Sequence, residues 1–135
     1  MTKTAFLFAG QGAQYLGMAR DLYERYDVVK ATFEEASQVL GYDVRALIDQ
    51  DEEKLNQTRY TQPAILTISL AIYRLLGEKG IRPDMVAGLS LGEYSALVAA
   101  GALDFKTAVA LVAKRGAFME EAAPAGSGKM VAVLN

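Results

Sequence analysis

Hydrophobic and polar positions along the chain predict short buried strands separated by long helices. Apolar runs at 4–9 and 85–89 each lead into a glycine-containing turn, as is typical of strands buried in a parallel sheet. A third apolar run, at 129–134, predicts another strand. Strands separated by long helical stretches indicate an α/β layered fold with a mainly parallel sheet.

Helical spacing fills the intervals between these strands. Apolar residues recur at steps of three and four in 28–40, and Gly41 follows as a C-cap. Gln62 or Pro63 is expected to open a long helix, because proline suits the first turn. The apolar stripe of that helix consists of Ile65, Ile68, Ile72, Leu75 and Leu76. Further helices are expected at 16–26, at 91–100 with Gly101 as cap, and at 104–121 with Asp104 as N-cap, with short helical turns at 43–57.

Composition excludes several kinds of site. The 135 residues include no histidine and no cysteine. Without cysteine there is no disulfide framework, zinc ribbon, iron–sulfur cluster or thiol nucleophile, and without histidine the commonest general base is missing. The formal net charge of −2 argues against a chain built to bind nucleic acid.

Neither a secretory signal nor a membrane span is expected. The first apolar run ends after five residues at the glycine turn 10–12, whereas a signal peptide needs about 7–15 apolar residues. The window 85–103 is largely apolar, but Glu93 lies in its middle, and a central carboxylate costs about 2.5–3.5 kcal/mol on insertion scales. We therefore expect a cytoplasmic protein.

The most informative segment is 88–92, Gly-Leu-Ser-Leu-Gly, which fits the G-x-S-x-G pattern between a predicted strand and a predicted helix. A tight strand-to-helix turn exposes Ser90 as a nucleophile, and glycines two before and two after it avoid a collision. The N–H of Leu91 would help to stabilise an oxyanion. The alternative is a capping box, in which Ser90 and Glu93 satisfy the first backbone donors of the helix.

Two other features have both a functional and a structural interpretation. The glycine turn 10–12 could supply a second oxyanion donor, the N–H of Gln11, or could simply connect a strand to a helix. Arg115 shares a helical face with Ala108, Leu111, Val112, Phe118 and Met119 and is expected to point inward. It could bind a substrate carboxylate bidentately, or it could pair with Asp or Glu or reach solvent.

Together these segments resemble one family. Residues 8–14, Gln62 with Pro63, residues 88–97 and the helix that carries Arg115 are similar in order and spacing to the amino-terminal part of the malonyl-CoA:acyl carrier protein transacylase family, which is related to the acyltransferase domains of polyketide synthases. The resemblance covers essentially all 135 residues.

The resemblance implies an α/β-hydrolase-like large subdomain with an inserted ferredoxin-like subdomain. On this sequence, 1–125 would belong to the large subdomain, and 126–135 would form a linker and the first strand of the small one. The resemblance also implies transfer of a malonyl group from coenzyme A to a serine and then to the phosphopantetheine thiol of acyl carrier protein. It implies no metal and no cofactor, and we expect a monomer.

Site roles follow from the same resemblance. Ser90 would be the nucleophile, the N–H groups of Gln11 and Leu91 the oxyanion hole, and Arg115 the partner of the malonyl carboxylate. Gln62 and Leu89 would line the pocket.

This sequence departs from the family in two respects. Leu89 stands where the family usually has histidine, which would change the pocket lining. The family's general-base histidine lies beyond the residues matched here, so we expect a truncated chain that is inactive alone. Another serine hydrolase, such as a thioesterase or esterase, and a non-catalytic fragment remain alternatives.

Overall fold

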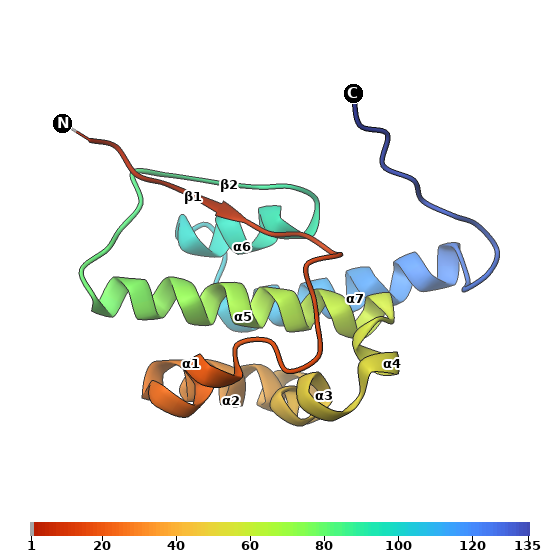
Figure 1. The fold of residues 1–135 in the computed structure, drawn as a ribbon, viewed down its shortest axis with the longest axis horizontal. Coiled ribbons are helices and arrows are strands. Elements are labelled where there is room, and N and C mark those ends of the chain that lie inside the picture. Colours follow the sequence, from red (N-terminus) through yellow and green to blue (C-terminus); the bar gives the residue numbers. More distant parts are fainter. Residues whose placement is uncertain (1) are drawn as a thin grey trace.

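A computed structural model describes residues 2–135 and places a small sheet above several layers of helices (Figure 1). Strands β1 (Ala5–Phe8) and β2 (Met85–Gly88) run parallel, with Ala5 beside Met85 and Phe8 beside Gly88. The helices are α1 (Arg20–Arg25), α2 (Asp27–Leu40), α3 (Val44–Gln50), α4 (Glu52–Leu55), α5 (Thr58–Glu78), α6 (Leu91–Ala99) and α7 (Phe105–Ala122). The chain is thus mixed α/β with a parallel sheet, as predicted.

The sheet is covered on one face only. Phe6 and Phe8 point toward the helices and pack on Tyr73 of α5, with ring centroids 6.3 and 6.4 Å apart. Leu7 and Met85 point the other way and are 81% and 57% exposed. The prediction of two fully buried strands was therefore wrong: the strands alternate in burial because the described residues place helices on a single side of the sheet.

Helix α5 is the centre of the fold. It packs against α7, α2 and α6, and its buried residues join those of the neighbouring helices in one apolar core. Among the largest fully buried side chains are Phe33, Ile48, Leu55, Leu66, Leu70 and Leu91. The α5–α7 contact is close at Gly116, where an added Cβ would lie 2.8 Å from the Cα of Arg59. Arg59 also donates from Nε to Glu120 at 2.5 Å.

Helix α5 begins earlier than the sequence predicted. It starts at Thr58 rather than at Gln62 or Pro63, and Pro63 lies inside it. A side chain in the first turn of α5 ties the helix to the end of α4, because the Thr61 hydroxyl donates to the Leu55 carbonyl. The predicted stripe is also only partly buried: Ile65 is in the core, whereas Ile72 is 36% exposed.

The other predicted elements differ mainly in length. Helix α2 ends at Leu40, and the φ of +79° at Gly41 fits the predicted C-cap; Asp104 caps α7. The helix expected at 16–26 is limited to α1, six residues long. The strand expected at 129–134 is not formed: these residues have no regular structure and are exposed. A strand needs a neighbour for its hydrogen bonds, and none lies beside this segment in the described structure. Its assignment to a second subdomain stays a prediction.

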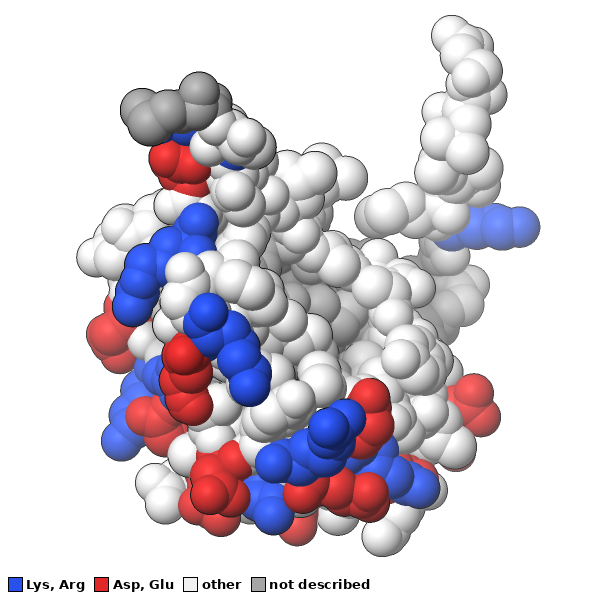
Figure 2. All heavy atoms as spheres, turned by 60° about the vertical axis from the view of Figure 1, so that its left-hand side comes forward, with Lys and Arg blue, Asp and Glu red and all other residues white. Residues whose placement is uncertain are grey.

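On the face that Figure 2 shows, Lys, Arg, Asp and Glu side chains lie along the bottom and up the left side, whereas the middle of the view and most of the tail are uncharged. Within residues 2–135, no helix combines the length and the apolar character needed to span a bilayer.

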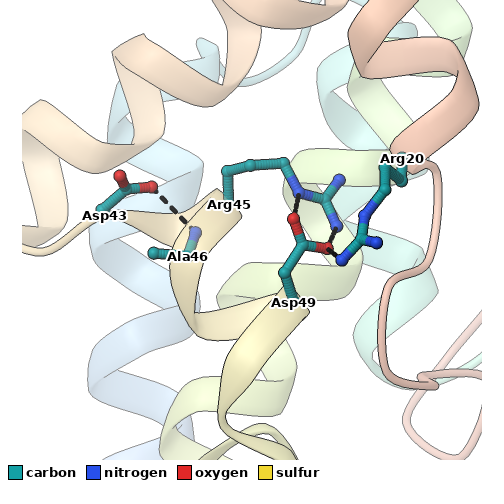
Figure 3. Close-up of polar contacts among 5 residues, drawn as sticks. All are labelled: Arg20, Asp43, Arg45, Ala46 and Asp49. Carbon is teal, nitrogen blue, oxygen red and sulfur yellow. Dashed lines mark hydrogen bonds and ion pairs between the residues drawn. The ribbon is translucent and has the colours of Figure 1, made fainter.

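A partly buried ion-pair cluster joins α3 to α1 (Figure 3). Arg45 is 8% exposed and forms a two-bond pair with Asp49, which also lies 3.2 Å from Arg20. The guanidinium of Arg45 stacks over the ring of Phe33 at 5.1 Å. Nearby, the Gly17 N–H donates to the Ile48 carbonyl at 2.8 Å. These contacts fix the segment that follows the glycine turn 10–12.

Candidate active site

Ser90 lies on a sharp turn between β2 and α6. Its backbone has φ 54° and ψ −114°, a conformation that L-residues rarely adopt. The turn depends on glycine on both sides. A Cβ added to Gly88 would lie 2.0 Å from the Gly92 carbonyl oxygen. A Cβ added to Gly92 would lie 2.2 Å from the Phe8 carbonyl oxygen. The steric reason for G-x-S-x-G given by the sequence therefore holds in this fold.

The capping-box alternative does not match the structure. Ser90 is the N-cap residue of α6, but its side chain makes no capping hydrogen bond. Its hydroxyl is instead exposed and accepts a hydrogen bond from Arg115 Nη2 at 3.0 Å. The strained turn thus presents the hydroxyl away from its own helix.

Arg115 reaches Ser90 from α7. Its Nη1 donates to Gln62 Oε1 at 2.9 Å, and its guanidinium carbon lies 5.4 Å from the centroid of the Tyr94 ring. Among the described residues it forms no ion pair with a carboxylate, so the expected structural pair with Asp or Glu is not seen. Arg115 therefore ends beside the serine with a charge that no acidic side chain neutralises.

The face of α7 that carries Arg115 is more open than predicted. Ala108 and Val112 are buried as expected, but Leu111 is 42% and Phe118 64% exposed. The buried face of the helix is rotated toward Val109 and Gly116, which pack on the core and on α5. Arg115 consequently lies at the border between the core and an exposed apolar surface.

Gln62 connects Arg115 to the glycine turn. The side chain is fully buried, and its Nε2 lies 3.5 Å from Gln11 Oε1 and 3.2 Å from Met119 Sδ. Gln11 in turn donates from Nε2 to Thr58 Oγ1 at 3.0 Å. A continuous chain of polar contacts thus runs from Ser90 through Arg115 and Gln62 to Gln11.

The glycine turn lies against the serine turn. A Cβ added to Gly10 would be 2.9 Å from the Leu89 carbonyl oxygen, so the two backbones touch at this point. Within residues 2–135, the backbone N–H groups of Gln11 and Leu91 donate no hydrogen bond. Both expected oxyanion donors therefore border the same turn, and neither is used in a hydrogen bond within the described residues.

Leu89, which was expected to line the pocket, is 83% exposed. In the part of the chain that the structure describes, no group of three or more His, Cys, Asp or Glu side chains is arranged to hold a metal ion.

Three residues join the site that the sequence interpretation did not assign to it. Tyr94 lies one helical turn after Ser90, and Met119 one turn after Arg115, so helical spacing could have identified both. Thr58 contacts Gln11 only because the start of α5 lies beside the glycine turn. No local pattern reveals that contact.

Comparison with known proteins gives a consistent result. A family model described as the acyl transferase domain matches residues 5–135. The malonyl CoA-acyl carrier protein transacylase of Bacillus subtilis is 54% identical over 99% of this chain and 43% of its own length. The crystal structure of MCAT from Streptococcus pneumoniae matches 90% of this chain and 40% of that one, with 80% identity and a TM-score of 0.89.

A further solved structure is a complex of a malonyl-transacylase with an acyl-carrier protein of a type II polyketide synthase. It is 55% identical, has a TM-score of 0.88 and covers 91% of this chain and 40% of that one. The chain thus spans less than half of the length of these relatives. With the family model matched over nearly all of its residues, the chain belongs to the acyl transferase domain family.

Proposed function

We propose that this chain supplies the nucleophile and the acyl-binding residues of a malonyltransferase. That enzyme would move a malonyl group from malonyl-CoA to the phosphopantetheine thiol of acyl carrier protein in fatty acid biosynthesis. The relatives are more than twice as long as the matched segment. The proposal therefore concerns a longer form, in which this chain is joined to a segment equivalent to the rest of those relatives.

The observation that carries the proposal is the pairing of Ser90 with Arg115. A serine on a strained strand-to-helix turn is arranged for nucleophilic attack, and the guanidinium 3.0 Å from its Oγ is arranged to bind an anion there. A neutral acyl group has no use for this charge. A malonyl thioester has a carboxylate, which would bind the Arg115 guanidinium in place of the Ser90 hydroxyl when the acyl group enters.

The proposed reaction has two halves. Ser90 Oγ attacks the thioester carbonyl, its proton passes to a base, and the oxyanion accepts hydrogen bonds from the N–H groups of Gln11 and Leu91. Collapse breaks the carbon–sulfur bond, releases the coenzyme A thiol and leaves malonyl-serine. Attack by the carrier thiol then reverses these steps. Because this chain has no histidine, we place the base in the remainder of the longer form.

The experiment is to mix the longer form with malonyl-CoA and measure the intact mass. We expect one malonyl adduct, mapped to the peptide that contains Ser90 and absent in Ser90→Ala. An adduct that persists in Ser90→Ala would reject the assignment of the nucleophile. Release of malonate without a carrier thiol would instead favour a hydrolase.

Arg115→Ala tests the acyl specificity. Loss of a bidentate carboxylate partner should lower kcat/KM for malonyl-CoA by about 100-fold or more, while acetyl-CoA is used as well as before or better. Lys114→Ala, a change on the adjacent exposed position of α7, is the matched control. Equal losses for malonyl-CoA and acetyl-CoA would contradict the role of Arg115.

The proposal includes a cytoplasmic location and a monomeric state. Sedimentation of the longer form, alone and with acyl carrier protein, would measure the second.

A further inference from the structure

The glycine turn 10–12 is weakly closed by its own backbone. The Ala13 N–H is 3.4 Å from the Gly10 carbonyl oxygen, at the long end of the range for a hydrogen bond. Gly12 has φ +111°, and an added Cβ there would meet nothing within 4 Å. Neighbouring atoms therefore do not hold this residue in place, and its conformation depends on the groups that bind its peptide.

Gln14 binds that peptide and connects it to α4. The Gly12 N–H donates to Gln14 Oε1 at 2.8 Å, and Gln14 Nε2 donates to Asn56 Oδ1 at 3.0 Å. Asn56 is itself held, because its Nδ2 donates to the Glu52 carbonyl at 3.0 Å. Both ends of the Gln14 amide are thus used, one on the turn and one on the end of a helix.

Gln11 is held from the same direction. Thr58, two residues after Asn56, accepts from Gln11 Nε2 at 3.0 Å. Gln14 fixes the peptide that follows Gln11, and Thr58 fixes the Gln11 side chain. These two contacts restrain Gln11 at its side chain and at the peptide that follows it, and so limit the directions open to its backbone N–H.

We propose that Gln14, acting through Asn56, is a positioning residue that directs the Gln11 N–H toward the oxyanion formed during acyl transfer. This inference rests on the proposed function of Ser90. Gln14 touches no reacting atom, so it acts only by keeping the donor oriented before the reaction. A donor that must be reoriented during the reaction stabilises the transition state less, and substrate binding is left unchanged.

The test compares two substitutions of Gln14 in the longer form. Gln14→Ala removes both contacts. Gln14→Glu keeps an acceptor for the Gly12 N–H but removes the donor to Asn56 Oδ1. Gln38→Ala, on α2, is a matched control away from the turn. Quenched-flow mass measurement with malonyl-CoA gives the rate and the amplitude of acylation of Ser90.

We expect Gln14→Ala to slow acylation by about tenfold, less than outright loss of an oxyanion donor, with full amplitude and an unchanged KM. Gln14→Glu keeps one of the two contacts and should show an intermediate rate, and Gln38→Ala should keep the full wild-type rate. An unchanged rate in Gln14→Ala, an equal loss in Gln14→Glu, or a reduced amplitude at the wild-type rate would each overturn the inference. Absence of an adduct in the wild-type protein would instead reject the proposed function and the inference with it.

Discussion

Helices α6 and α7 both begin after a residue with a good capping side chain, but only α7 uses its cap. Asp104 starts α7 with φ −78°, and its Oδ1 accepts from the Thr107 N–H at 3.0 Å. Ser90 starts α6 with φ 54°, makes no capping bond and accepts from Arg115 instead. A residue with a capping side chain therefore stabilises its helix only where the backbone before it has room to turn.

The difference arises in the residues that precede each helix. Before Ser90, β2 runs directly into the helix, and the carbonyl of Gly92 lies where a side chain of Gly88 would be. Before Asp104, the chain turns at Gly101, which has φ +77° and no atom within 4 Å of an added Cβ. The two helices also meet, because α7, which begins with a used cap, carries Arg115 to the strained Ser90 at the start of α6.

The strained start of α6 depends most strongly on Gly88. Gly88→Ala places a Cβ 2.0 Å from the Gly92 carbonyl oxygen, so the turn must open. We expect the longer form to lose about 3 kcal/mol of stability, measured by urea unfolding, and to lose acylation of Ser90.

Gly101→Ala is the control for that substitution. It has a positive φ but no neighbour within 4 Å of the added Cβ, so it should cost only about 1 kcal/mol and leave acylation intact. Equal effects at the two glycines would show that the close approach at Gly88 is unimportant.

A pair of alanine substitutions compares the two helix starts directly. Asp104→Ala removes a cap that is in use, and thermal unfolding of the longer form should shift down by a few degrees with the acylation rate preserved. Ser90→Ala removes no capping bond, so acylation should disappear while the melting temperature hardly changes. A large fall in the melting temperature of Ser90→Ala would mean that the serine stabilises its helix after all.

The smallest expected effect is a dependence on pH. Hydrogen bonds from the Thr107 hydroxyl and N–H hold the pKa of Asp104 below its usual value of 3.8. A pKa that is lower in the folded state means that the carboxylate contributes stability above pH 3.8. That contribution is lost as the pH falls through the lowered value.

Asp104→Asn keeps a capping oxygen without the charge. The difference in urea midpoint between the wild-type protein and this variant should therefore shrink between pH 6 and pH 2. A difference that is constant with pH would contradict the role of the charge.

The local parts of the site were accessible from the sequence. Glycines around Ser90 can be interpreted sterically without a structure, and Arg115 shares a helical face with neighbours that the spacing reveals. The choice between nucleophile and cap for Ser90 required its backbone conformation and its contact with the Arg115 guanidinium. That contact joins two helices, α6 and α7, and no local pattern reveals it. Thr58 and Asn56 were missed for the same reason, since only the packing of α4 and α5 brings them to the glycine turn.

The errors in the fold have one common cause. Apolar runs show that a segment favours burial, but they do not show what covers it. Leu7 and Phe118 are apolar and exposed, and 129–134 has strand-like composition without a neighbouring strand. The predicted start of α5 at Gln62 or Pro63 was wrong for a different reason, because the helix already begins at Thr58 and accommodates the proline inside it.

Gly116 has a consequence for the geometry of the site, although it lies outside the polar contacts that join Ser90, Arg115 and Gln62. It follows Arg115 in the chain, and its lack of a side chain lets α7 lie against the backbone of Arg59. A methyl group at Gly116 would lie 2.8 Å from both the Arg59 Cα and the Thr58 carbonyl oxygen, so α7 and the start of α5 would have to move apart. We therefore expect Gly116→Ala to shift Arg115 relative to Ser90 and Gln62 without altering any side chain at the site.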